Sequence, residues 1–159
     1  MTGSSKSSAT PSAQRTRVFV SYSHKDKKFL DEFKTMLAPV KDLIDLWDDT
    51  MIKPGAKWLK EIEKALAAAR VGVLLVSDSF FASPFITKKE VPELLKAAKE
   101  AGATIFWVRL TPSLVGRSEI KEYQAAHDIS KPLDQLSKAK RKAVWEEICK
   151  KLLDILENP

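Results

Sequence analysis

The chain has 159 residues, 44% of them hydrophobic, which is enough for the core of one globular domain and leaves no room for a second. Its 27 basic and 21 acidic residues give a net charge of +6, yet the lysines are scattered in pairs and form no long basic block. A single cysteine excludes an internal disulfide and a multi-cysteine zinc site. No stretch reaches the roughly 18 to 20 apolar residues of a membrane span, and the N-terminus lacks a signal-peptide core, so we expect a cytoplasmic protein.

The first 16 residues differ in composition from the rest of the chain. They are rich in serine, threonine and alanine and contain almost no large apolar side chain. Such a segment cannot bury enough surface to offset the entropy that ordering would cost. We therefore predict a flexible leader over residues 1–16 and one folded domain over residues 17–157.

The folded part alternates strand-like and helix-like segments. Runs of β-branched and aromatic residues predict strands at residues 17–22, 43–47, 71–77 and 104–110. The segment between residues 111 and 139 shows little periodicity. Strands that alternate with helices and are apolar on both faces indicate a parallel sheet with helices packed on each side.

Apolar residues at a spacing of three and four predict the intervening helices. The second helix is expected to bury Trp58 and Leu59 on the same face as Ile62. Residues 79–101 are expected to form one broken helix or two short ones, ended by Gly102. The inward faces of the helices are predicted to include Phe29, Leu30, Phe33, Ala65, Leu66, Ala69, Trp145, Ile148 and Leu152.

Ligands of open parallel sheets bind beyond the carboxyl ends of the strands, which directs attention to the residues that follow each strand. These segments supply polar and aromatic side chains and one isolated carboxylate, Glu90. The set comprises Ser21, Tyr22, Ser23, His24 and Asp26 after the first strand, Trp47, Asp48 and Asp49 after the second, and Ser77 and Asp78 after the third.

Several familiar sites are excluded by residue type. The sequence contains no P-loop, no dinucleotide-binding glycine motif and no nucleophile elbow of a serine hydrolase. His24 and His127 lie too far apart in the sequence for metal-ligand spacing, so each is interpreted as a surface or capping residue. Cys149, on an amphipathic helix, is interpreted as a buried structural thiol.

At these positions the sequence resembles a TIR (Toll/interleukin-1 receptor) domain, particularly the bacterial type. The resemblance covers roughly residues 17–157 and implies a flavodoxin-like three-layer α/β sandwich with a central parallel five-stranded sheet. Many family members carry tryptophan four residues before the acidic residue, whereas here Phe85 lies five residues before Glu90. The matching motifs are VFVSYSHKD at 18–26, LWDDTMIKPGAKWLKEIEKALAAARVGVLLVSDSFFAS at 46–83, FITKKEVPELL at 85–95 and YQAAHDISKPL at 123–133.

The resemblance implies an activity, because some TIR domains cleave the nicotinamide–ribose bond of NAD⁺. Glu90 matches the glutamate on which those members depend, and NAD⁺ would be a substrate, with no bound cofactor or metal. The alternative interpretation of Glu90 is a solvated residue at a helix end. The products would be nicotinamide and ADP-ribose or a cyclic ADP-ribose isomer.

Further substrate contacts are expected from residues at the strand ends. For Tyr22, Ser23 and Asp26 capping of the first helix is an equally good interpretation, and Trp47 either packs in its strand or stacks on a ring. Phe80, Phe81 and Phe85 are interpreted as core residues. The expected substrate-binding residues are Tyr22, Ser23, Asp26, Trp47, Asp48 and Ser77.

Assembly is the other property that the resemblance implies. Lys53, Pro54 and Gly55 lie in the loop at 48–57 that matches the family's BB loop, which touches a neighbouring TIR domain. We expect self-association to activate the enzyme, with a sensing or oligomerising domain as a further partner. A TIR module that only recruits other TIR domains is the alternative function. Nucleic-acid binding driven by the +6 charge ranks last, and we expect neither a nucleic acid nor a membrane as partner.

Overall fold

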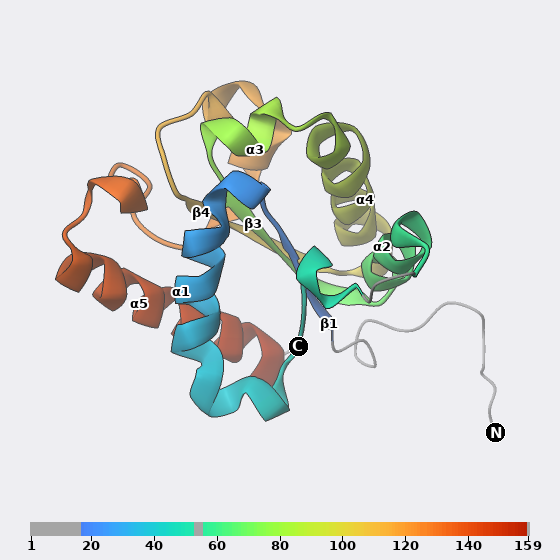
Figure 1. Cartoon of the computed structure of the whole chain (residues 1–159), viewed down its shortest axis with the longest axis horizontal. Helices are drawn as coiled ribbons and strands as arrows, with labels where there is room; N and C mark the ends of the chain where they lie inside the picture. Colours follow the sequence, from blue (N-terminus) through green and yellow to red (C-terminus); the bar gives the residue numbers. More distant parts are fainter. Residues whose placement is uncertain (1–16, 53–55, 159) are drawn as a thin grey trace.

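A computed structural model describes residues 17–52 and 56–158 (Figure 1). The predicted leader at 1–16 and the loop residues Lys53, Pro54 and Gly55 lie outside this range. The described residues form a five-stranded, all-parallel sheet in the order β2-β1-β3-β4-β5. Its strands are β1 (Arg17–Ser21), β2 (Asp45–Trp47), β3 (Ala69–Val76), β4 (Thr104–Arg109) and β5 (Gln124–Ala125).

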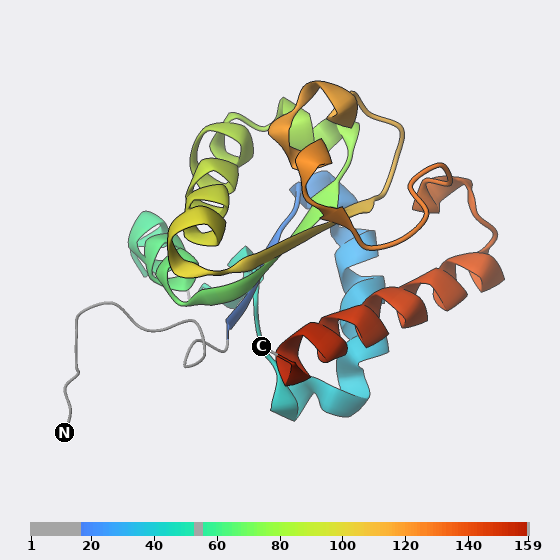
Figure 2. The same cartoon turned by 180° about the vertical axis from the view of Figure 1, so that it is seen from behind.

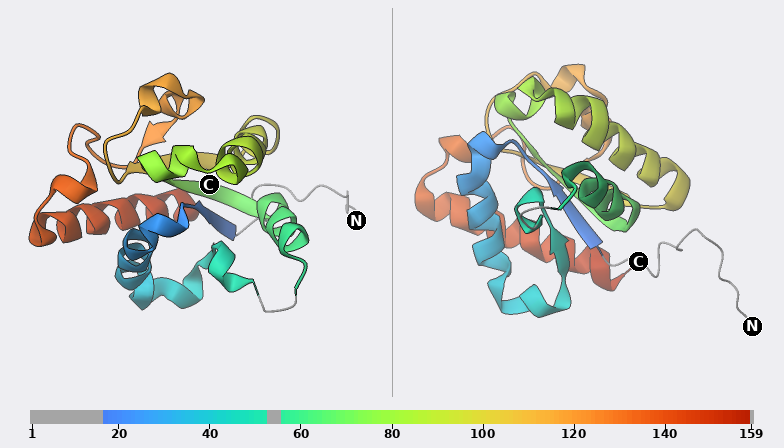
Figure 3. Two further views of the ribbon diagram at one scale, coloured as in Figure 1. Left: turned by 45° about the horizontal axis from the view of Figure 1, so that its top comes forward. Right: turned by 45° about the vertical axis from the view of Figure 1, so that its right-hand side comes forward.

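Helices cover both faces of the sheet, which confirms the predicted flavodoxin-like sandwich (Figures 2 and 3). On one face α1 and α5 pack against Val18, Val20 and other strand residues of the same orientation. On the opposite face α2, α3 and α4 pack against residues such as Phe19 and Leu74, because successive strand side chains point to opposite sides. The helices are α1 (Lys27–Leu37), α2 (Trp58–Ala67), α3 (Asp78–Ala82), α4 (Val91–Ala101) and α5 (Lys138–Glu157).

The fifth strand lies in the segment that showed little periodicity. β5 has only two residues, too few to produce an alternating pattern. It is held beside β4 by the main chain of Ala126, whose N–H donates to the carbonyl of Trp107 at 2.8 Å. The indole of Trp107 in turn donates to the carbonyl of Tyr123 at 3.1 Å. Contacts between distant segments, and not local sequence, therefore define this strand.

The prediction that the second helix buries Trp58 and Leu59 in its first turn is wrong. Trp58 and Leu59 are each 46% exposed, while Ile62 is buried as predicted. Trp58 packs against Phe85, with the ring centroids 4.5 Å apart. Ala69, expected on this helix, begins β3 instead. The periodicity continues to the helix start, but Trp58 borders the pocket described below.

Two other positions also differ from expectation. Leu43, predicted to begin the second strand, ends a 3₁₀ helix, Ala38–Leu43, and is exposed. His127 is not a surface residue: it is buried, and its Nε2 accepts a hydrogen bond from the main-chain N–H of Arg109 at 2.9 Å. Burial lowers the pKa of His127, so the neutral imidazole serves as a structural acceptor. Cys149 is buried in α5, as predicted.

The chain between α3 and α4 contains the predicted break. A π turn, Ile86–Glu90, continues directly into α4, whose first turn contains Pro92. The wider π turn directly before Pro92 shifts the hydrogen bonding by one residue, so that the N–H of Val91 donates to the carbonyl of Ile86. α4 ends at Gly102, which has a φ of 75°, and this confirms the predicted helix end.

Candidate functional site

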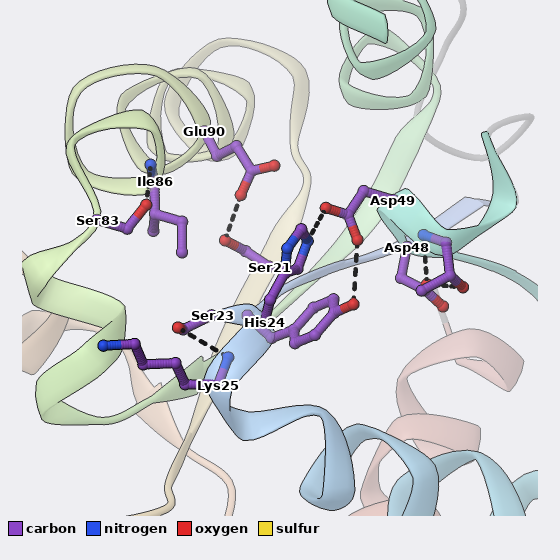
Figure 4. Close-up of polar contacts among 11 residues, drawn as sticks. Ser21, Ser23, His24, Lys25, Asp48, Asp49, Ser83, Ile86 and Glu90 are labelled. Carbon is purple, nitrogen blue, oxygen red and sulfur yellow. Dashed lines mark hydrogen bonds and ion pairs between the residues drawn. The ribbon is translucent and has the colours of Figure 1, made fainter. Parts of the chain in front are cut away.

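A pocket of about 290 Å³ opens at the carboxyl ends of β1 and β2, the edge of the sheet where ligands were expected. It lies between the residues that follow these strands and the π turn that leads into α4 (Figure 4). The residues that line it are Tyr22, Ser23, His24, Lys25, Asp49, Trp58, Ser83, Phe85, Ile86 and Glu90.

Glu90 is the buried carboxylate of this pocket. Its side chain comes from the last residue of the π turn and points toward the end of β1 (Figure 4). The hydroxyl of Ser21 donates to its Oε1 at 2.7 Å, and Glu90 is only 6% exposed. The alternative interpretation of a solvated residue at a helix end is therefore wrong.

The surroundings of Glu90 favour its neutral form. Burial raises its pKa from 4.5 to about 7, and the nearby carboxylate of Asp49 acts in the same direction. The hydrogen bond from Ser21 and the proximity of His24 oppose this rise, because both stabilise the ionised form. At neutral pH the side chain therefore exchanges between a carboxylic acid and a carboxylate, which is typical of functional sites.

The π turn explains the unusual distance between Phe85 and Glu90. In an α-helix, residues three or four apart share one face, and the wider π turn holds one residue more. The turn begins after Phe85 and ends with Glu90, so that both side chains border the pocket although they are five residues apart. The spacing that departs from the family pattern thus still brings an aromatic ring and the carboxylate together.

Asp49 is a second carboxylate in the pocket. Its Oδ1 accepts a hydrogen bond from the hydroxyl of Tyr22 at 3.1 Å, and its Oδ2 lies 2.5 Å from Nε2 of His24. Figure 4 shows the ring of His24 beside this carboxylate. Burial and the neighbouring Asp49 raise the pKa of Tyr22, so the phenol remains protonated and donates to Asp49.

Two of the predicted substrate-binding residues line the pocket, namely Tyr22 and Ser23. Ser23 also caps the 3₁₀ turn that precedes α1, because its hydroxyl accepts from the N–H of Lys25 at 3.3 Å. The capping interpretation of Ser23 is therefore confirmed, while its contact with a substrate stays a prediction. The hydroxyl of Tyr22 donates to Asp49, and Ser23 is the residue whose side chain caps the turn before α1.

The other four predicted contacts have structural partners outside this pocket. Trp47 is buried and stacks on Phe19 with ring centroids 5.2 Å apart, which favours packing over ligand stacking. Asp26 accepts from the hydroxyl of Ser77 at 2.5 Å, and both side chains are buried. Burial raises the pKa of Asp26, while the bond from Ser77 opposes the rise.

Asp48 likewise points away from the pocket. Its carboxylate is completely buried, pairs with Nζ of Lys34 at 3.0 Å and accepts hydrogen bonds from the N–H and the hydroxyl of Thr50. These contacts cap the 3₁₀ turn Asp49–Met51 that follows β2. Asp48 therefore holds the turn that presents Asp49 to the pocket.

Seven residues of the pocket are not among the predicted catalytic and substrate-binding residues, namely His24, Lys25, Asp49, Trp58, Ser83, Phe85 and Ile86. His24 was interpreted as a surface or capping residue, Asp49 was passed over for its neighbour, and Trp58 and Phe85 were assigned to the core. The paired aspartates at the end of a strand were a signal, but only the turn after β2 decides which of the two faces Glu90. Within the described part of the chain, no three acidic, histidine or cysteine side chains are grouped to hold a metal ion.

The fold and this pocket agree with a comparison against protein families. The model of the TIR domain family matches residues 18–146, which is most of the chain, and the chain therefore belongs to the TIR domain family. A search of curated proteins finds no match. In the described residues, no helix is both long and apolar enough to cross a membrane.

Proposed function

We propose that this TIR domain is an NAD⁺ glycohydrolase or cyclase, with Glu90 as its catalytic carboxylate. The observation that supports the proposal most directly is the position of Glu90, buried in a pocket at the ligand-binding edge of the sheet. The TIR family includes members that cleave NAD⁺. The products would be nicotinamide and ADP-ribose or a cyclic isomer of ADP-ribose.

A single carboxylate is chemically sufficient for this reaction. Ordinary glycosidases need a second carboxyl group because an alkoxide leaving group must be protonated. The nicotinamide of NAD⁺ is a pyridinium that leaves as a neutral base, so no general acid is required. The remaining task is to stabilise the cationic ribose, which a carboxylate in a water-poor pocket does well. The ionised form of Glu90 is then the active one.

The size of the pocket indicates which part of the substrate it would hold. About 290 Å³ lies near the lower end of the range of ~300–1,000 Å³ that small-molecule sites occupy. This volume suits the nicotinamide and its ribose, with the rings of Trp58 and Phe85 at its border. The diphosphate and adenosine would extend out of the pocket toward the surface.

Self-association would complete such a site. Residues 53–55, predicted to contact a neighbouring TIR domain, are flanked by the exposed apolar side chains of Met51, Trp58 and Leu59. Trp58 is also part of the pocket border, so a neighbouring domain that covers these side chains would reach the substrate. The same exposed side chains favour the second candidate function, a TIR module that only binds other TIR domains.

Turnover of NAD⁺ by the Glu90→Gln variant distinguishes the two candidates. Purified wild-type chain at high concentration should release nicotinamide, measured by chromatography, and Glu90→Gln should lower this rate at least ~100-fold because the carboxylate proposed to stabilise the ribosyl cation is lost. Glu93→Gln is the matched control, since Glu93 is an exposed glutamate one turn further along α4. A wild-type chain that self-associates but leaves NAD⁺ intact would contradict the enzyme and favour the interaction module.

A further inference from the structure

The His24 and Asp49 pair is a feature that cleavage of the nicotinamide–ribose bond does not require. Both side chains border the same pocket as Glu90 but come from different segments, one after β1 and the other after β2. Nε2 of His24 and Oδ2 of Asp49 are 2.5 Å apart. A close carboxylate–imidazole contact beside a reactive centre is the arrangement that enzymes use to move a proton.

The carboxylate of this pair is held in a defined orientation. Asp49 is largely buried, with 16% of its side chain exposed, and each of its oxygens has a partner: Tyr22 at Oδ1 and His24 at Oδ2. Asp48, its neighbour in the chain, anchors the turn through Lys34. Asp49 can therefore fix the orientation of the imidazole.

The imidazole itself is accessible to water. The side chain of His24 is 72% exposed. An Asp49 carboxylate selects the tautomer whose proton is on Nε2, and Nδ1 is then the ring nitrogen that accepts a proton. The carboxylate stabilises the imidazolium that forms when the ring accepts a proton.

We propose that His24, oriented by Asp49, accepts the proton of the water molecule that captures the ribosyl cation, and so directs the reaction toward hydrolysis. Cleavage leaves the electron pair of the C1′–N bond on nicotinamide and a positive charge on the ribose. A lone pair of water forms the new C1′–O bond, and one water proton passes to Nδ1 of His24. The imidazolium returns this proton to solvent after ADP-ribose has left.

The charged groups around His24 suit this role. Asp49 approaches the ring from the turn after β2, and Glu90 faces the same pocket from the π turn. The phenol of Tyr22 lies beside the ring, with centroids 5.5 Å apart. Lys25, the cation next in the chain, also borders the pocket. Two carboxylates thus face one histidine and one lysine, and they stabilise the positive charge that develops on His24.

The inference rests on the proposed function, and a comparison of two reactions tests it separately. In hydrolysis a water proton must be removed, whereas 3-acetylpyridine replaces nicotinamide through its nitrogen lone pair and has no proton to lose. Both reactions need Glu90, but only hydrolysis needs His24. Rates of ADP-ribose formation and of 3-acetylpyridine exchange would be measured for wild type, His24→Gln, Asp49→Asn, Glu90→Gln and, as a control outside the pocket, Lys27→Gln.

We expect His24→Gln to lower hydrolysis by about 100-fold, within the range typical of general bases, and to leave exchange within about threefold of wild type. Asp49→Asn, which keeps the shape of the side chain but not its charge, should lower the ratio of hydrolysis to exchange in the same direction. Circular dichroism would verify that each variant is folded.

Three other results would overturn the inference. Unchanged hydrolysis in His24→Gln would remove His24 from the reaction and leave the role of Glu90 intact. An equal loss of hydrolysis and exchange would mean that His24 only positions substrate. A wild-type chain that catalyses neither reaction, even when assembled, would remove the proposed function together with this inference.

Discussion

At the scale of single residues, the properties of the pocket depend on how Glu90 is balanced between its two protonation states. Burial favours the acid, and the hydroxyl of Ser21 favours the carboxylate. The result is a pKa of about 7, so the fraction of ionised Glu90 changes steeply across the neutral range. Ser21 is itself 1% exposed and cannot exchange its partner for bulk water.

The pH dependence of exchange should report this balance. We expect kcat/KM for 3-acetylpyridine exchange to rise about tenfold per pH unit below pH 7 and to level off above it, because the free enzyme needs ionised Glu90. Ser21→Ala should move the bend of the profile to higher pH, since a hydrogen bond that stabilises the carboxylate is lost. A profile that stays flat from pH 5 to 8 would contradict this prediction.

The free energy of unfolding should also depend on the protonation of Glu90, but it should fall as pH rises, whereas exchange activity should increase. The folded pKa of Glu90 lies above its unfolded value, so the contribution of protonated Glu90 to stability is complete below pH 4.5 and is lost as pH rises through about 7. The shift from 4.5 to about 7 corresponds to about 3 kcal/mol. Glu90→Gln should therefore gain up to that much relative to wild type between pH 5 and pH 8.5 in urea unfolding, whereas Glu93→Gln should show no such trend.

At the scale of elements, the segment between β3 and β4 determines where Glu90 lies. The π turn sets the distance between Phe85 and Glu90, and α4 then fixes the turn to the sheet through the buried residues Leu94 and Leu95. Gly102 ends this helix in a left-handed conformation and directs the chain into β4. The position of the catalytic candidate thus depends on a helix that is anchored at both ends.

Replacement of Gly102 tests the importance of that helix end. Gly102→Ala should lower the free energy of unfolding by about 1 kcal/mol, because a side chain is disfavoured at a φ of 75°. Gly116→Ala is the control: a Cβ there meets no atom within 4 Å, and the change should stay within about 0.5 kcal/mol. Equal values for the two variants in urea unfolding would show that the helix end carries no conformational cost.

At the scale of the whole molecule, the exposed apolar side chains are unevenly distributed over the described surface. Met51, Trp58 and Leu59 are between 46% and 53% exposed, and in the sequence they precede and follow residues 53–55. Leu43 and Leu114 are more exposed still, at 81% and 80%, but Leu43 ends the 3₁₀ helix Ala38–Leu43, Leu114 lies in the loop after β4, and neither lines the pocket. Of the first group, Trp58 also lines the candidate site.

A charged residue introduced among Met51, Trp58 and Leu59 should weaken self-association. Leu59→Glu places a carboxylate on the exposed first turn of α2, and we expect the dissociation constant of the assembly to rise about tenfold or more. NAD⁺ turnover should fall in parallel at low protein concentration. Leu114→Glu, an equally drastic change in the loop after β4, should alter neither; sedimentation velocity that shows equal assembly of both variants would contradict the proposed surface.

Much of the fold could be predicted from the sequence, because its signals are local. The four longer strands and Gly102 all follow from periodicity and residue type within a few positions. β5 could not be predicted in this way, since two residues carry no period. The exposure of Trp58 was missed for a related reason: periodicity identifies the face of a helix but not where the sheet beneath it ends.

The sequence by itself determined the alternation of strands and helices and the presence of one isolated carboxylate before Pro92, because these are properties of neighbouring residues. Only the tertiary structure decided that Glu90 is buried, since its partner Ser21 lies 69 positions away in the chain. It also decided that Asp49, and not Asp48, faces the pocket. Successive side chains at a strand end point in opposite directions, and the packing of β2 and its turn against β1 selects between them.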